Sequence, residues 1–336
     1  MTIEATEFSP RRGGREIVAD PSARPESAES DALVLFLAEG GVGSGACGDV
    51  DRATGGLLSR LVAAGDITGK RFECVPLLAP PGLRAAQLLV VGVGTRQDLD
   101  AGTLYRAAAT ATRQLSGRPR SRVVLVADAT WSPRQTEQAV AGGAVGMVGQ
   151  DLYRAERKRT PIGTTVWVGA TPDAVERGAA IGDGVNLARR LVNTAPDDMY
   201  PQTFAEEAAA VAGRTGMEVT IWDEEQLARE RCHAILAVGR GSNRPPRLVV
   251  LRYRGPGHGD GPPDLALVGK GVTFDSGGLS LKPSESMLTM KCDMAGAAAV
   301  LGAAATIAAL RLPVHLVAAV GLAENMTGPA AYKLGD

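Results

Sequence analysis

The sequence predicts an α/β fold with mostly parallel, buried sheets, because short apolar runs rich in Val, Leu and Ile alternate with longer helix-like stretches. The apolar runs predict strands at residues 32–38, 88–93, 122–127, 164–169, 217–222, 247–252, 264–268 and 314–321. The main stretches between them predict helices at residues 104–115, 135–148, 174–192, 204–214 and 294–310. A hydrophobic content of 45% over 336 residues is enough to build a sizeable core.

The pattern of these elements divides the chain into a tail and two domains. Residues 1–30 are polar, and no apolar stretch follows the arginines near the start, so we expect a flexible tail and not a signal peptide. Residues 31–170 form the first predicted domain. A basic segment at 154–161, one more strand and a long helix mark the boundary, and residues 171–336 form the second domain.

Composition excludes several classes of function. The formal net charge of −1 argues against strong electrostatic binding of nucleic acid or of an anionic membrane. No apolar run reaches the length that a membrane span needs. The four cysteines are scattered without a CxxC pair, so they indicate neither a zinc knuckle nor a disulfide framework. We therefore expect a cytoplasmic protein that binds neither membrane nor nucleic acid.

Charged residues gather in residues 268–300, where a predicted strand ends. Lys270 stands between two glycines, Asp275 and Lys282 follow, and Asp293 precedes an alanine-rich helix. Open α/β sheets place ligand sites at the carboxyl ends of strands. Carboxylates with some nitrogen suit hard divalent cations, and nearby cations lower the pKa of a lysine amine. Taken singly, Asp293 is equally explained as a helix cap, and a lysine such as Lys270 is more often a surface residue.

Together these residues form VGKG-x-TFDSGG, then SLKP, then K-x-DM-x-GAA. This pattern resembles the signature of the leucyl aminopeptidase family of cytosolic dinuclear metallopeptidases. Further segments that resemble the family lie at residues 187–205, 235–253 and 323–336, the second of them like a strand–loop–strand unit. The resemblance implies a macro-domain-like N-terminal α/β domain followed by a zinc-peptidase-like α/β catalytic domain.

The resemblance also implies a role for each matched residue. Lys270, Asp275 and Asp293 would bind two divalent metal ions, Mn²⁺ or Zn²⁺, and Lys282 would be a catalytic cation near the substrate carbonyl. The metals would make a bridging water nucleophilic, and Lys282 would stabilise the developing oxyanion. The substrates would be peptides with a free N-terminus, from which the enzyme releases residues such as leucine in peptide catabolism. Family members are usually hexamers.

The chain departs from the family pattern at its end. The family completes its metal site with a later motif, Asn-Thr-Asp-Ala-Glu-Gly-Arg, which lies downstream of the loop that residues 323–336 resemble. This motif is absent from the 336 residues. We therefore expect the catalytic domain to be incomplete, and the chain as given to have little or no peptidase activity.

Two other functions fit parts of the sequence. A non-catalytic binding or regulatory protein on the peptidase scaffold would account for the missing motif. A nucleotide-binding protein is suggested by Gly92 and Gly94 after a strand, but the third glycine of a dinucleotide fingerprint is missing. Gly271 follows Lys270 where a P-loop would have Ser or Thr. The three histidines are isolated and lack HExxH spacing, so they predict no other metal site.

Overall fold

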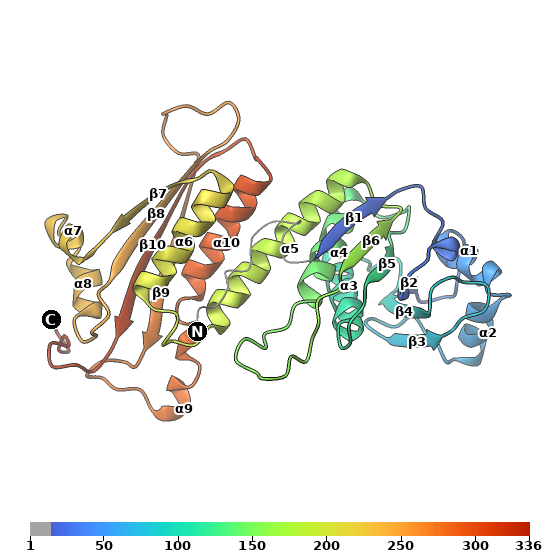
Figure 1. The fold of residues 1–336 in the computed structure, drawn as a ribbon, viewed down its shortest axis with the longest axis horizontal. Helices are drawn as coiled ribbons and strands as arrows, with labels where there is room; N and C mark the ends of the chain where they lie inside the picture. The colour runs from blue at the N-terminus through green and yellow to red at the C-terminus, as the bar shows by residue number, and fades with distance from the viewer. Residues whose placement is uncertain (1–14) are drawn as a thin grey trace. The chain divides into compact units, whose positions relative to one another are not determined.

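The computed structural model describes residues 15–336, and the chain separates into two compact units, Met1–Asp183 and Gly184–Asp336 (Figure 1). Both units combine helices with a β-sheet, so the expected α/β class is confirmed. Helix α5 (Pro172–Asn193) contains the boundary between the two units. The first fourteen residues of the predicted tail lie outside the described residues.

The first unit is built on a six-stranded sheet with the order β1-β6-β5-β2-β4-β3. Five of these strands are parallel, and β3 runs antiparallel to β4. The strands are β1 (Glu16–Asp20), β2 (Ala32–Ala38), β3 (Cys74–Leu78), β4 (Gln87–Gly94), β5 (Arg122–Val126) and β6 (Thr164–Val168).

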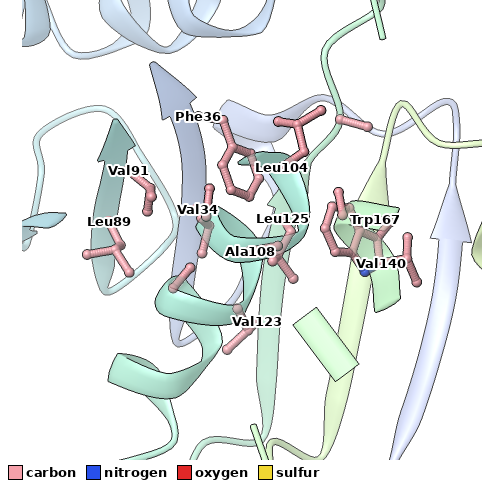
Figure 2. Packing of buried hydrophobic residues seen from close by; sticks show 14 of the residues in the cluster. Val34, Phe36, Leu89, Val91, Leu104, Ala108, Val123, Leu125, Val140 and Trp167 are labelled. Atoms are coloured by element: carbon pink, nitrogen blue, oxygen red, sulfur yellow. The ribbon is translucent and has the colours of Figure 1, made fainter. Parts of the chain in front are cut away.

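Helices cover both faces of this sheet, so its central strands are apolar on both sides. Along β2, Phe36 points into a core that includes Trp167 and Leu104 (Figure 2), whereas Leu35 points into the opposite core with Leu58. The helices of the unit are α1 (Ala46–Ala53), α2 (Leu57–Ala64), α3 (Ala101–Leu115) and α4 (Pro133–Gly146), with a 3₁₀ turn at Pro25–Ser27. This arrangement explains why the strands are near-continuous hydrophobic runs.

Strand β1 corrects the predicted tail, because its residues are part of the sheet. It pairs in parallel with β6, with Glu16 opposite Thr164. Ile17 and Ala19 pack against one core of the sheet and Val18 packs against the other. The short apolar run Ile-Val-Ala therefore adds an edge strand within a segment whose overall composition is polar.

The second unit contains a four-stranded sheet with the order β7-β8-β10-β9. The sheet is mixed, which corrects the expectation of mostly parallel sheets: β8 runs antiparallel to β7 and β10, and only β9 pairs with β10 in parallel. The strands are β7 (Glu218–Trp222), β8 (Arg247–Arg254), β9 (Leu265–Asp275) and β10 (His315–Asn325). β9 lies at an edge of the sheet, and Val268 on it is 80% exposed.

Helices of the second unit pack against both faces of its sheet. A Cβ atom at Gly271 would meet Leu322 and Ala297, which places helix α10 on that face, and a Cβ atom at Gly321 would meet Ile235 of α8 on the other. The helices are α6 (Pro201–Thr215), α7 (Glu224–Arg229), α8 (His233–Gly239), α9 (Ser284–Met287) and α10 (Ala295–Ala309), with a 3₁₀ turn at Met290–Cys292. The apolar residues of α8 belong to the segment expected to begin with a strand, so that expectation is wrong at this point.

The stretch Ser284–Ala309 is long and apolar enough, by length and composition, to cross a membrane. A core helix passes the same test, and 44% of the most apolar window is buried inside the protein. The structure divides the stretch into α9, a 3₁₀ turn and α10. The 15 residues of α10 are fewer than the roughly 20 that a spanning helix needs.

Candidate metal centre

Strand β9 carries two of the four predicted site residues, Lys270 and Asp275. Gly269 allows this strand to approach α10 closely, because a Cβ atom there would lie 2.8 Å from the Cα of Ala297. Asp293 lies two residues before α10. The close packing of strand and helix brings Lys270 Nζ to 2.8 Å from Asp293 Oδ1.

A tight loop after β9 brings Lys282 back to the end of the strand. Gly277 and Gly278 have φ angles of 89° and 65°, which side-chain-bearing residues adopt at a cost. The backbone N–H of Lys282 donates to the Ser276 carbonyl at 2.9 Å, which closes the loop. As a result, Lys282 Nζ donates to Asp275 Oδ2 at 2.5 Å and lies 2.9 Å from the sulfur of Met290.

The carboxylate of Asp275 accepts three hydrogen bonds. Besides the bond from Lys282, its Oδ1 accepts from the Gly277 N–H at 3.0 Å and from the Asn325 side chain at 2.8 Å. Burial alone would raise the pKa of Asp275, but these donors stabilise its charged form and lower the pKa below its usual value. The carboxylate is therefore ionised and fixed in direction near neutral pH.

Asp293 has one carboxylate oxygen that the protein leaves without a partner. Its side chain is 20% exposed, and Oδ1 accepts from Lys270, whereas Oδ2 is buried with no hydrogen-bond partner. An unpaired carboxylate oxygen in a buried position is unfavourable unless another group compensates it. A bound cation would provide that compensation.

The predicted residues fit a divalent cation by the chemistry of their donor atoms. Asp275 and Asp293 provide carboxylate oxygens, and Lys270 would provide an amine nitrogen when deprotonated. No group of three or more His, Cys, Asp and Glu side chains in residues 15–336 is arranged to hold a metal. The candidate centre therefore depends on the lysine as its third donor. In the structure the four residues form two ion pairs, Lys270 with Asp293 and Lys282 with Asp275.

Several residues without a predicted role lie beside these pairs. Asn325 lies at the register position of Asp275 on the neighbouring strand, and Met290 contacts Lys282. The preceding residue, Glu324, is bound by Arg244. The contact of Asn325 with Asp275 depends on the pairing of β9 with β10, which the resemblance of residues 323–336 to a family loop does not predict.

An open pocket of about 380 Å³ lies in the same unit. Its lining residues come from the first turn of α6 and from the loops before α6 and before β8: Asp197, Tyr200, Gln202, Asn243, Arg244 and Pro245. None of the four predicted site residues lines it. Arg244, which lines this pocket, forms an ion pair with Glu324 on β10, the strand that pairs with β9 beside Asp275.

Both units match the same family. Residues 34–161 match the model of the cytosol aminopeptidase family, N-terminal domain, and residues 186–336 match that of its catalytic domain. A probable cytosol aminopeptidase of Rhodopirellula baltica is 41% identical over 82% of this chain, and one of Syntrophotalea carbinolica is 40% identical over 92%. The chain spans 53% and 64% of the lengths of these two relatives.

Solved structures agree with the sequence matches. The bottromycin maturation enzyme BotP in complex with Mn aligns with a TM-score of 0.75 at 31% identity, over 91% of this chain and 62% of BotP. A mutant of tomato leucine aminopeptidase aligns with a TM-score of 0.80 at 26% identity, over 95% of this chain and 65% of the tomato protein. The two family domains, the identities and the shared fold together lead to one conclusion: the chain belongs to the cytosol aminopeptidase family.

Proposed function

We propose that this chain contributes to a metal-dependent aminopeptidase that releases N-terminal residues, preferentially leucine, from peptides. The observation that carries the proposal is the pairing of Lys270 with Asp293 and of Lys282 with Asp275, with a buried Asp293 oxygen left unpartnered. These four residues belong to the sequence segment that resembles the signature of the leucyl aminopeptidase family. The relatives named cytosol aminopeptidase and leucine aminopeptidase support both the reaction and the leucine preference.

The metal site of this proposal uses Lys270, Asp275 and Asp293 to hold two divalent ions, Mn²⁺ or Zn²⁺. The complex of BotP with Mn, at 31% identity, supports manganese. When bound, such ions lower the pKa of a water molecule and polarise a carbonyl oxygen. The carboxylate of Asp275, whose Oδ1 is held by two neutral donors, would be one of the ligands.

The proposed role of Lys282 follows from its position beside the ligand Asp275. Its side chain is 29% exposed, and its ammonium group is held by Asp275 and by the sulfur of Met290. A positive charge in a partly water-excluded site interacts more strongly than it would in water. Lys282 would therefore stabilise the negative charge that develops on the substrate carbonyl oxygen.

We further infer that these 336 residues alone have little or no peptidase activity. Three donors leave a two-metal site short of ligands, because divalent ions of this kind bind at least four. The test is Mn²⁺-dependent hydrolysis of leucyl p-nitroanilide by the 336-residue chain and by the polypeptide that the full coding frame encodes. Activity of the 336-residue chain equal to that of an intact relative would refute the inference.

The same assay tests the proposed function. If the coding frame continues into Asp-Ala-Glu-Gly-Arg, we expect the longer polypeptide to be active with Mn²⁺, and Lys282→Met to lower its kcat by about 10²–10³-fold. Lys291→Met is the matched control, since no hydrogen bond or ion pair joins Lys291 to the four site residues. A longer polypeptide without activity in either Mn²⁺ or Zn²⁺ would overturn the assignment.

A second candidate is a non-catalytic binding protein on the peptidase scaffold. The observation that favours it is that the two lysines neutralise both aspartates, so that the cluster is balanced in charge without a metal. A stop codon directly after residue 336, together with no measurable Mn²⁺ binding, would support this candidate. Continuation of the frame and Mn²⁺-dependent hydrolysis would exclude it.

Location and assembly remain part of the proposal. Relatives named cytosol aminopeptidases support a cytoplasmic location. The family resemblance implies a hexamer, and peptides with a free N-terminus as partners. Sedimentation of the purified polypeptide measures the assembly state directly, and a monomer at micromolar concentration would contradict the hexamer.

A further inference from the structure

The end of β10 lies directly against the carboxylate of Asp275. Asn325 is the last residue of β10 and pairs in register with Asp275 on β9. Its side-chain amide donates to Asp275 Oδ1 at 2.8 Å, and the Gly277 N–H donates to the same oxygen at 3.0 Å. The other oxygen, Oδ2, accepts from Lys282. The two oxygens of this carboxylate therefore have different partners: Oδ1 is bonded to neutral donors and Oδ2 to a charged one.

Asn325 is itself held in one orientation. Its backbone carbonyl accepts from both the N–H and the hydroxyl of Ser276, at 3.0 and 2.8 Å. A Cβ atom at Gly278 would lie 2.9 Å from Asn325 Oδ1, so the loop packs closely over the side-chain amide. Only 8% of Asn325 is exposed. The hydrogen bonds to its backbone and the burial of its side chain hold the amide beside Asp275.

The residue before Asn325 fixes the strand end from another direction. Glu324 is 10% exposed and accepts from Arg244 Nη1 at 3.1 Å and from the Ser242 hydroxyl. Arg244 also donates to the Pro196 carbonyl at 2.8 Å, and its guanidinium lies 4.5 Å from the ring centroid of Tyr200. A buried carboxylate of this kind is costly unless it is paired, so the pair clamps the end of β10.

We propose that Asn325 is a positioning residue that fixes the rotation of the Asp275 carboxylate, and that the ion pair of Arg244 with Glu324 holds Asn325 in place. The consequence for metal binding rests on the proposed function, whereas the effect on Lys282 does not. With Oδ1 held by Asn325, Oδ2 faces Lys282. Residues that orient a metal ligand typically change metal affinity by about 10–100-fold when they are removed.

The first experiment measures lysine accessibility in the metal-free full chain. Brief acetylation followed by mass spectrometry gives the labelling rate of Lys282 relative to that of Lys270, which is bound to Asp293 and serves as the internal reference. In Asn325→Leu, which keeps the size but removes the donor, we expect the Lys282 rate to rise severalfold and the Lys270 rate to stay unchanged. An unchanged ratio, or an equal rise at both lysines, overturns the proposal.

Two further variants keep this experiment decisive if Asn325→Leu does not fold. Arg244→Met removes the clamp on the strand end, and we expect it to raise the Lys282 rate by a smaller factor. Asn243→Leu is the matched control, because Asn243 is an exposed neighbour of Arg244 that lines the open pocket. We expect it to leave both rates unchanged. An Arg244→Met chain that folds and labels as the parent does would refute the role of the clamp.

The second experiment measures the Mn²⁺ dissociation constant of the same chains by calorimetric titration. We expect Asn325→Leu to weaken binding by about 10–100-fold and Asn243→Leu to leave it unchanged. An unchanged constant in Asn325→Leu overturns the positioning role. If the parent chain binds no Mn²⁺, the proposed metal site fails, and the labelling ratio still decides whether Asn325 positions Asp275.

Discussion

A buried carboxyl group in the first unit makes stability depend on pH in an uncommon direction. Asp183 lies in helix α5, and burial raises its pKa from 3.8 to about 6, an effect that the nearby Arg15 only partly offsets. A shift of about two units corresponds to roughly 3 kcal/mol between the protonated and ionised forms. Because the folded state favours the protonated form, ionised Asp183 destabilises it.

The sign of the effect follows from proton linkage. Well below pH 3.8 the carboxyl is protonated in both the folded and the unfolded states, and it carries no penalty. As the pH rises towards 6, the unfolded chain ionises first, so the free energy of unfolding falls and then levels off above the folded-state pKa. The penalty works out to about 1 kcal/mol at pH 4.5 and about 3 kcal/mol at pH 8.

Asp183→Asn removes this penalty because the amide stays neutral. We expect the variant to raise the free energy of unfolding by about 3 kcal/mol at pH 8 and about 1 kcal/mol at pH 4.5. Urea denaturation followed by circular dichroism at the two pH values measures both numbers. Glu176→Gln, at an exposed position of the same helix, should change the free energy by less than about 0.5 kcal/mol. A gain that is equal at both pH values, or a loss at pH 8, would refute the reasoning.

Two more predictions concern packing in the second unit, and urea unfolding measures both. Arg190 donates two 2.8 Å bonds to Glu207, and both side chains are at most 20% exposed, so Arg190→Ala should lower the free energy of unfolding by about 3–5 kcal/mol. A loss below about 1 kcal/mol would contradict this. A Cβ atom at Gly184 would lie 2.1 Å from Thr306 Oγ1, so Gly184→Ala should cost about 1–3 kcal/mol. The matched change at Gly213, which has open space and lies within α6, should stabilise by about 0.4–1 kcal/mol; equal effects would argue against the clash.

Sequence patterns predicted the elements whose two faces are buried. Strand β2 has the predicted bounds, and β4 differs from them by one residue at each end, because buried parallel strands are continuous apolar runs. Helix α8 was misread since a short apolar run does not distinguish a strand from a buried helix. Strand β1 was missed because three apolar residues in a polar segment give little signal until β6 is placed beside them.

The candidate site was predictable to the extent that it is local in sequence. Lys270, Asp275, Lys282 and Asp293 all lie within 24 positions of one another, so the signature contained them together. Asn325 lies 50 residues beyond Asp275, and their contact exists because β9 and β10 are neighbours in the sheet. Strand order in a mixed sheet is a tertiary property that no local pattern encodes.

The position of β9 at a sheet edge bears on how this polypeptide behaves in concentrated solution. Within residues 15–336 no strand pairs with its outer side, beside the exposed Val268, and such edges template pairing with other chains. We therefore expect concentrated solutions of the 336-residue chain to self-associate through the strand that carries Lys270 and Asp275. Association through this strand would bury the candidate centre. If metal binding decreased as the protein was concentrated, the cause would be pairing at the sheet edge and not the choice of ligands.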